Sequence, residues 1–332
     1  MDLYNYKYGF GPLSKNIVDA CIDYVNKYNL NLSLIPSRRQ LDYGSGYSNN
    51  WTTKTFSEYV KKRTNKIFLK RDHGGPNQGN FKDDGKLSLE IDCLYFHCIH
   101  IDPWRIAKTF KDGCELTKSY IQHCYKLNKE ITYEIGTEES IFKYEASDLD
   151  YLLSFLKREL SIPEFNNIKY AVIQCGTSLA YNTNTGKYNK QRLLDMIKIC
   201  KKYYVNTKEH NGDYLPIDLI HEKFDNGLDL INIAPEFGQI ETNVYLNEVK
   251  NTELFNIYFD LCFESKKWEK WVDIDFNPKL NKTKTINICG HYLLSNEIFL
   301  SQIKSKIRKD IDDIIKNKVR ERLDELYVRF KT

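Results

Sequence analysis

Short apolar runs alternate with longer amphipathic segments along about the first 250 residues of the chain. Apolar runs bounded by polar turns are typical of buried strands in a parallel sheet, and apolar residues three and four apart are typical of helices. The pattern predicts strands over residues 6–12, 30–36, 67–71, 93–101, 131–136, 170–174, 205–209 and 228–234. It predicts helices that begin at Ser14 and Thr52, and helices over residues 84–91, 113–128, 146–160, 190–203 and 216–224.

The repeated strand–helix unit indicates how the sheet is built. Eight such units over about 240 residues are the pattern of a parallel (β/α)8 TIM barrel. The alternative is an open doubly wound sheet, whose first strand usually leads into a Gly-x-Gly-x-x-Gly turn. No such turn follows residues 6–12, so the barrel is the favoured prediction.

The alternation of strand and helix patterns ends near residue 250. Residues 253–266 have a helical pattern, residues 268–276 are aromatic and charged, and residues 295–330 predict one or two further helices. In this last segment apolar residues recur at helical spacing, namely Ile303, Ile307, Ile311, Ile314, Ile315, Val319, Leu323 and Leu326. We therefore expect a barrel over residues 1–250 and a mostly helical C-terminal extension over residues 251–332. The extension should pack on the barrel or, as the less favoured alternative, at the interface of a homo-oligomer.

Composition argues against a nucleic-acid-binding, membrane-spanning or disulfide-rich protein. The 332 residues are 41% hydrophobic and 28% charged, which is ordinary for a globular protein. A formal net charge of +4 is too small to indicate a nucleic-acid partner, and no apolar run reaches the roughly 18 residues of a membrane span. Nine cysteines without a Cys-x-x-Cys pair indicate reduced thiols. We expect a cytoplasmic protein with a small-molecule partner, and no binding to nucleic acid or membrane.

Side chains that can bind a metal or transfer protons follow six of the predicted strands. They are Asp72 and His73, His100 and Asp102, Glu138, Gln174, His210 and Asp213, and Asn232. In a barrel the carboxyl ends of all strands face one mouth, where active sites are built. Side chains far apart in the sequence would therefore meet there.

Part of this set has the chemistry of a divalent-metal site. His73, His100 and Glu138 are separated by 27 and 38 residues, each about one strand–helix unit, and His210 follows the seventh strand. Imidazole and carboxylate ligands with one open position suit zinc, with manganese, cobalt and nickel as alternatives. Only two or three of these four side chains need be ligands.

The same residues carry a resemblance to a known family. Asp72-His-Gly-Gly-Pro-Asn77 is similar to the Gly-Asp-His-Leu-Gly-Pro-Asn motif of the tagatose-bisphosphate aldolase accessory-subunit family. Ile135-Gly-Thr-Glu138 matches its Ile-Gly-Thr-Glu. Two further segments, His100-Ile-Asp102 and Glu209-His-Asn-Gly-Asp213, resemble its His-Leu-Asp and Glu-Ala-His-Ser-Thr-Asp. The order is the same over about residues 8–250, but Asn232-Ile-Ala-Pro235 stands where that family has Lys-Val-Gly-Pro.

The resemblance implies a class II aldolase-type barrel, whose relatives include metal-dependent ketose-bisphosphate aldolases, ketose-phosphate 4-epimerases and non-catalytic helper subunits. It implies that Asp72 is the acid/base at the aldol hydroxyl and that His73 and His210 bind the metal. Glu138 would be a further ligand or a base, and we group Asp102 with the catalytic candidates.

The expected reaction is therefore retro-aldol/aldol chemistry on a ketose that carries phosphate, with cleavage and 4-epimerisation left open. Two alternatives remain. One is a silent subunit that stabilises a true aldolase, and the other is metal-assisted isomerisation through an enediol.

Polar and glycine residues near the mouth are candidates for substrate binding. They are Arg39, Gln40, Asn77, Gln174, Asn211, Gly212, Asp213 and Asn232. Backbone N–H groups in the last loops of a barrel often bind phosphate. An arginine after the second strand would add positive charge to the mouth.

Overall fold

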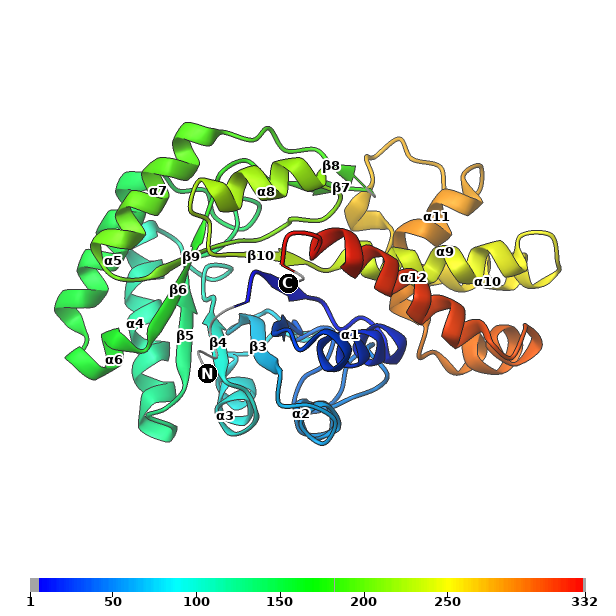
Figure 1. Cartoon of the computed structure of the whole chain (residues 1–332), viewed down its shortest axis with the longest axis horizontal. Helices are drawn as coiled ribbons and strands as arrows, with labels where there is room; N and C mark the ends of the chain where they lie inside the picture. The colour runs from blue at the N-terminus through cyan, green and yellow to red at the C-terminus, as the bar shows by residue number, and fades with distance from the viewer. Residues whose placement is uncertain (1–5, 182, 331–332) are drawn as a thin grey trace.

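A closed ring of parallel strands organises the fold (Figure 1). The computed structural model of the chain describes residues 6–181 and 183–330. Within these residues the ring has the order β1-β10-β9-β6-β5-β4-β3-β2, and neighbouring strands are parallel. The strands are β1 (Tyr8–Phe10), β2 (Leu32–Leu34), β3 (Ile67–Gly74), β4 (Cys98–Ile101), β5 (Thr132–Ile135), β6 (Ile168–Ile173), β9 (Asn206–Glu209) and β10 (Leu230–Ile233). Because β1 pairs with both β2 and β10, the predicted TIM barrel is confirmed and the open sheet is wrong.

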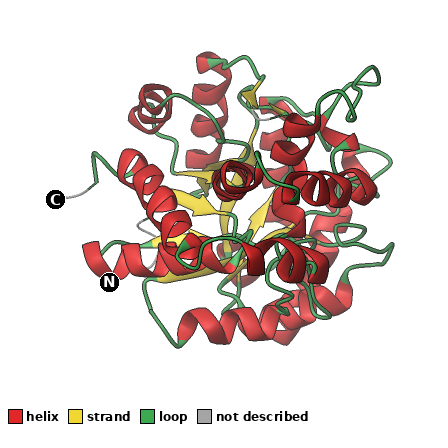
Figure 2. Ribbon diagram, turned by 90° about the vertical axis from the view of Figure 1, so that its right-hand side faces the viewer, coloured by secondary structure: helices red, strands yellow, loops and turns green. Residues whose placement is uncertain are grey.

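Helices surround this ring (Figure 2). Those that follow the strands are α1 (Lys15–Tyr28), α2 (Thr53–Lys61), α3 (Lys86–Tyr95), α4 (Phe110–Leu127), α5 (Ala146–Glu159), α7 (Lys190–Lys202), α8 (Ile217–Asp225) and α9 (Pro235–Val249), with the short α6 (Ile162–Asn166) before β6. Local sequence sets where the first two helices begin. The Ser14 hydroxyl accepts a hydrogen bond from the Ile17 N–H (3.2 Å), and the Thr52 hydroxyl accepts one from the Thr55 N–H (3.1 Å).

The fourth barrel strand begins later than the sequence predicts. The apolar run over residues 93–101 predicts a strand from Cys93, but α3 continues to Tyr95 and β4 begins at Cys98. Cys93 belongs to the buried face of α3. The run therefore joins the last turn of a helix to a strand, and hydrophobicity alone does not separate the two. A small hairpin after β6, formed by β7 (Leu179–Ala180) and β8 (Thr183–Asn184), has no counterpart in the prediction.

The segment beyond α9 is helical, as predicted, and lies to the right of the barrel strands in Figure 1. It comprises α10 (Leu254–Ser265), α11 (Lys282–Cys289), α12 (Ile311–Leu326) and the short turns η1 (Glu269–Trp271), η2 (Gly290–Leu293), η3 (Phe299–Ile303) and η4 (Lys304–Lys306). The apolar stripe of α12 packs on α1 and α9 of the same chain. Its residues Ile315, Val319 and Leu323 are fully buried. The Tyr8 hydroxyl of β1 donates a hydrogen bond to the Leu326 carbonyl (2.9 Å), which ties the last helix to the first strand.

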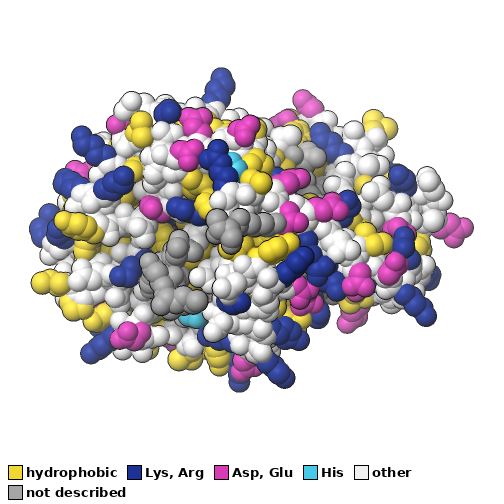
Figure 3. Space-filling view, in the orientation of Figure 1, with side chains coloured by type: hydrophobic (Ala, Val, Ile, Leu, Met, Phe, Trp, Pro, Cys, Tyr) yellow, Lys and Arg dark blue, Asp and Glu magenta, His cyan; other side chains and the backbone are white. Residues whose placement is uncertain are grey.

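Positive and negative side chains are interspersed on the molecular face shown in Figure 3. The nine cysteines are all free thiols and all are buried. Of the helices in the described residues, none combines the length and the apolar character needed to cross a bilayer. On the face shown, charges of both signs therefore largely cancel, and no extended field of one sign forms there.

Candidate active site

Two consecutive residues at the end of β3 face the same space in the barrel mouth. Successive side chains of a strand normally point to opposite faces. Here the pairing of β3 with β4 shifts register between Arg71 and Gly74, and His73 has a positive φ of 48°. Such backbone is costly for a non-glycine residue and is found at functional sites. As a result His73 Nε2 lies 3.7 Å from Asp72 Oδ2.

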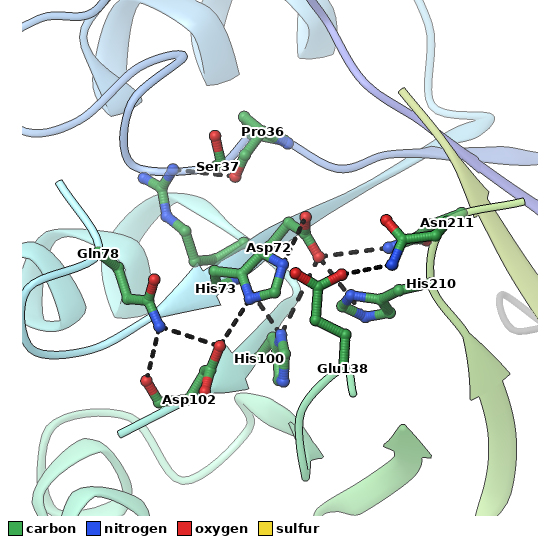
Figure 4. Close-up of polar contacts among 12 residues, drawn as sticks. Pro36, Ser37, Asp72, His73, Gln78, His100, Asp102, Glu138, His210 and Asn211 are labelled. Atoms are coloured by element: carbon green, nitrogen blue, oxygen red, sulfur yellow. Dashed lines mark hydrogen bonds and ion pairs between the residues drawn. The ribbon is translucent and has the colours of Figure 1, made fainter. Parts of the chain in front are cut away.

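Three imidazoles from three strand ends meet beside Asp72 (Figure 4). The ring centres of His73, His100 and His210 lie 5.1–5.2 Å from one another. Asp72 Oδ1 lies 3.7 Å from Nε2 of His210 and 4.0 Å from Nδ1 of His100. The structure thus brings together an aspartate and three histidines that the sequence places on three different strands.

Hydrogen bonds behind two of the imidazoles fix their orientation. Asp102 Oδ2 lies 2.6 Å from His73 Nδ1 and accepts a hydrogen bond from Gln78 Nε2 (3.0 Å). His100 Nε2 donates to the Gly136 carbonyl (2.9 Å). The remaining ring nitrogens, His73 Nε2 and His100 Nδ1, face the shared space, as in metal sites where a carboxylate or carbonyl holds the outer nitrogen of each ligand. Asp102 is fully buried and reaches the site through His73, so we treat it as a positioning residue.

A buried carboxylate that the sequence analysis missed lies under the imidazoles. Glu134 of β5 places Oε1 2.8 Å from His210 Nε2 and 3.8 Å from His100 Nδ1. Its Oε2 contacts the ammonium groups of Lys70 (2.6 Å) and Lys208 (2.7 Å), and all three side chains are fully buried. Burial alone would raise the pKa of Glu134, but the two lysines hold it well below its usual range. Glu134 is therefore ionised.

Electrostatics also keep Asp72 ionised. Burial alone would raise the pKa of Asp72, but the neighbouring His73, His210 and Lys208 hold it below its ordinary value. Burial alone would lower the pKa of His73, but Asp72 and Asp102 raise it to about 10. The Asp72 carboxylate is thus an available proton acceptor.

The rim of the site is polar. Asn232 Nδ2 donates to Asp72 Oδ1 (3.2 Å). Asn211 Nδ2 donates to Glu138 Oε2 (2.6 Å), and Figure 4 shows these two side chains pointing toward each other. Two residues expected to bind substrate, Asn211 and Asn232, therefore lie beside the candidate catalytic groups.

The donor set fits a divalent cation. Among the described residues two overlapping groups have donor atoms within 4.8 Å of one another: His73, His100 and His210, and Asp72, His100, Glu134 and His210. Imidazoles with a carboxylate suit zinc and its transition-metal neighbours. His100 Nδ1 accepts a hydrogen bond from the His73 backbone N–H (3.2 Å) and His210 Nε2 contacts Glu134 Oε1 (2.8 Å), so an ion bound by either ring would replace that contact. Glu138, expected as a ligand, is in neither group, whereas Glu134 is.

Comparison with known proteins supports the architecture. No family model matches the sequence, and no curated protein matches it. The structure resembles a probable tagatose 6 phosphate kinase from Sinorhizobium meliloti 1021, with a TM-score of 0.73 and 13% identity over 97% of this chain and 99% of that chain. It resembles the YdjI aldolase from Escherichia coli K12 (TM-score 0.56, 13% identity, 92% and 94% covered). It also resembles a fructose-bisphosphate aldolase from Campylobacter jejuni (TM-score 0.56, 11% identity, 90% of each chain).

At these identities the likeness shows a shared fold. It extends over nearly the whole of this chain, including the segment beyond α9. The TIM barrel with a helical C-terminal part is therefore an architecture that aldolase structures also have.

Several residues expected to bind substrate also hold loops, and their contact with a substrate stays a prediction. They are Gln40, Asn77, Gln174, Gly212 and Asp213. Both ends of the Gln174 side-chain amide, the oxygen and the nitrogen, form hydrogen bonds to backbone groups of the β5–α5 loop. Gln40 Oε1 accepts a hydrogen bond from the Ser37 N–H (2.9 Å). Asn77 Oδ1 accepts from the Asp83 N–H (3.2 Å). Asp213 Oδ1 accepts two N–H groups at the start of α9 (2.8 Å each).

Gly212 has a packing role, since a Cβ there would lie 2.5 Å from the Ile231 side chain. Arg39 is different from the five residues above. It lines a cavity beside the C-terminal segment.

Proposed function

We propose that this chain is a metal-dependent enzyme that makes or breaks a carbon–carbon bond of a ketose by aldol chemistry, as an aldolase or a 4-epimerase. The observation that carries the proposal is the convergence of Asp72 with the imidazoles of His73, His100 and His210 at one barrel mouth. The aldolases among the similar structures support it, because their barrels have the same architecture.

Asp72 performs the first proton transfer. A divalent ion held by His73 and His210 would act as a Lewis acid on the ketone. Asp72 accepts the proton of the hydroxyl on the carbon beyond the bond that breaks. The electron pair of that bond moves to the carbon next to the carbonyl, which gives an aldehyde and an enediolate. Asn232 keeps the Asp72 carboxylate in place through its hydrogen bond of 3.2 Å.

Glu138 performs the second proton transfer. It is half-buried at the rim and held by Asn211, so its carboxyl group lies between the site and solvent. Transfer of a proton from Glu138 to the enediolate carbon completes cleavage. If the aldehyde is instead kept, turned and attacked on its other face, Asp72 returns its proton to the new alkoxide and the product is the 4-epimer. Both outcomes use the same residues, so only product analysis separates them.

Metal analysis is the first test. The purified wild-type chain, incubated with zinc and desalted, should retain about one ion per chain. The His210→Ala variant should lose that ion. The matched control is His123→Ala, because His123 lies on the outer helix α4 and contacts only Glu90 (3.1 Å) among the charged groups described. A wild-type chain that retains no ion contradicts the proposal and favours the silent-subunit alternative.

Product analysis is the second test. The zinc-loaded protein is incubated with a panel of ketoses and ketose phosphates in deuterated water and followed by NMR. Triose fragments identify an aldolase, and a C4 epimer identifies an epimerase. Deuterium at the carbon next to the carbonyl, without fragments or a C4 epimer, would indicate isomerisation through an enediol and would contradict the aldol proposal.

A further inference from the structure

A cavity of about 330 Å³ lies where the barrel loops meet the C-terminal segment. Its lining includes Arg39, Tyr47 and Gly79 from the loops after β2 and β3, and Lys267, Lys270 and Tyr292 from beyond α9. The volume is at the lower end of the range of small-molecule sites. The cavity is therefore large enough for one substituent of a substrate.

The positive charges of this cavity lack counter-ions. In the described part of the chain, none of Arg39, Lys267 and Lys270 forms an ion pair with a carboxylate. Arg105 beside them donates from Nε to the amide oxygen of Gln78 (2.6 Å) rather than to an acid. Lys270 is exposed by surface area, yet desolvation of its ammonium group by surrounding atoms and the charges of Arg39, Lys267 and Arg105 lower its pKa to about 8. Such a cluster is stabilised by an anion.

Aromatic rings hold the Lys270 ammonium in place. Its Nζ lies 4.5 Å from the ring centre of Trp271 and 5.2 Å from that of Tyr292. Trp271 Nε1 donates to the Tyr292 hydroxyl (3.3 Å), and the Trp271 carbonyl accepts from the Tyr181 N–H (3.3 Å). The charge is therefore presented on a fixed support, which lowers the entropy cost of binding a ligand.

The cavity borders the candidate catalytic centre. Gly79, in the cavity lining, directly follows Gln78, whose side chain contacts the Asp102 that holds His73. Gln78 connects the same two regions, because its amide nitrogen donates to Asp102 (3.0 Å) while its oxygen accepts from Arg105. A molecule with its ketone at the histidines can therefore extend an anionic end toward Lys270.

We propose that this cavity is the phosphate subsite of the enzyme, in which Arg39 of the barrel and Lys270 of the C-terminal segment bind the phosphate group of a sugar phosphate. Arginine offers a planar fork to phosphate oxygens, and lysine a point charge. Glu269 also borders the cavity. Because its carboxylate would repel an anion, the phosphate binds on the side of Arg39 and Lys270. The sugar part of the ligand rests on the function proposed above, whereas phosphate binding does not.

Phosphate binding is measured on the full chain without a sugar. Inorganic phosphate is titrated at low ionic strength and followed by phosphorus NMR, with equal chloride as the salt control. Lys270→Met and Arg39→Met should each weaken phosphate binding roughly tenfold or more, because each removes a charge-assisted contact. Lys306→Met is the matched control, since Lys306 is exposed in η4 and outside the cavity lining. Wild-type phosphate affinity in both cavity variants overturns the proposal, as does a wild-type chain that binds no phosphate.

A comparison of fructose with fructose 6-phosphate separates this proposal from the proposed reaction. Both cavity variants should weaken binding of the phosphate ester by a larger factor than binding of the free ketose. If phosphate binding depends on Arg39 and Lys270 while no ketose is turned over, the subsite stands and the aldol function fails. If ketoses are turned over but the variants change kcat/KM equally for phosphorylated and free sugars, the function stands and the subsite is overturned.

Discussion

The three carboxylates around the histidines differ in what their oxygens contact. Asp102 is paired with His73 and Gln78, and Glu134 is paired with two lysines; both are fully buried. The side chain of Asp72 is 14% exposed and, among the described residues, has one hydrogen bond, from Asn232. A group that exchanges a proton with a substrate must be reachable by it, and of these three only Asp72 is.

The Asp72→Asn variant tests this assignment. An amide cannot accept the hydroxyl proton, so turnover should fall by roughly two to four orders of magnitude. Metal content should stay near the wild-type value, because the imidazoles remain. Both are measured on the same preparation, with Asp275→Asn as control, since Asp275 is exposed and outside the site. Full turnover by Asp72→Asn would remove the proton-transfer role.

The Glu134→Gln variant tests the role of the buried carboxylate. It leaves the ammonium groups of Lys70 and Lys208 without a negative partner in a dry environment. Breaking a buried ion pair from one side typically costs about 3–5 kcal/mol, so the free energy of unfolding in urea should fall by that order. Glu139→Gln is the control, because its pair with Lys143 is more exposed and should contribute less than about 1 kcal/mol. A loss below about 1 kcal/mol for Glu134→Gln would contradict this account.

Sequence reasoning finds Asp72, His73, His100 and His210 because reactive side chains at strand ends are visible as a pattern. It misses Glu134, which lies inside β5, although a glutamate in an otherwise buried strand must find a partner and is itself a signal. The positioning role of Asp102 depends on the shift in register before Gly74. That shift is a property of the strand pairing, and no local pattern in the sequence specifies it.

At the level of elements, predictions are best where a helix or strand has its own local signal. The Ser14 and Thr52 caps give the starts of α1 and α2 within one residue. The predicted start of β4 is wrong because the preceding helix ends without a glycine or proline that would mark the boundary in the sequence. Which side chains pair between elements is set by the tertiary fold.

Glu241 of α9 connects three helices through buried polar groups. It accepts hydrogen bonds from the Ser14 hydroxyl and from Asn16 Nδ2 (2.9 Å), at the start of α1. Asn16 also donates to Asp312 Oδ1 of α12 (2.8 Å). Burial raises the pKa of Glu241 to about 7. The contribution of this junction to stability should therefore change with pH in a range where exposed carboxylates no longer titrate.

The Glu241→Gln variant should remove that response. The unfolded chain releases the Glu241 proton near pH 4.3, whereas the folded chain holds it to about pH 7. Because the folded state binds the proton more tightly, the contribution of Glu241 to stability is greatest below about pH 4 and falls as the pH rises toward 7. Relative to wild type, the unfolding free energy of Glu241→Gln should rise by about 2–3 kcal/mol between pH 5 and pH 8.

Urea unfolding at several pH values measures this difference. Glu297→Gln is the control, because Glu297 is exposed and should follow the wild type at every pH. A difference between Glu241→Gln and wild type that does not change with pH would contradict the assignment.

On the scale of the whole molecule, the barrel and the C-terminal segment share one apolar core. A single cluster of buried side chains includes Leu34 of the barrel as well as Leu323 of α12. The Tyr24 hydroxyl of α1 donates to the Leu323 carbonyl (3.1 Å), and Arg322 pairs with Glu236 of α9 (2.6 Å). The sequence shows that the strand–helix alternation ends near residue 250. It does not show that α12 returns to pack on α1, because that contact joins the two ends of the chain.

Leu323→Ala tests whether the two parts unfold together. Truncation of a fully buried leucine costs about 2–5 kcal/mol. Leu323 lies between the last helix and the barrel, so in one cooperative unit this loss should lower the urea midpoint of the whole chain. Trp51 and Trp104 report on the barrel, and Trp268 and Trp271 report on the C-terminal segment. Replacing either pair with Phe gives two backgrounds whose fluorescence follows one part each.

In both backgrounds Leu323→Ala should shift the same transition by the same amount. Leu300→Ala is the control, since Leu300 is 41% exposed and its loss should matter little. Two transitions, of which only the C-terminal one moves, would mean that residues beyond 250 form a separate unit. In that case Lys270 would be carried by a part that can open independently, and Lys270 could reach a phosphate at the barrel mouth only while that part is closed. A single transition instead keeps Arg39 and Lys270 at a fixed separation, as a preorganised subsite requires.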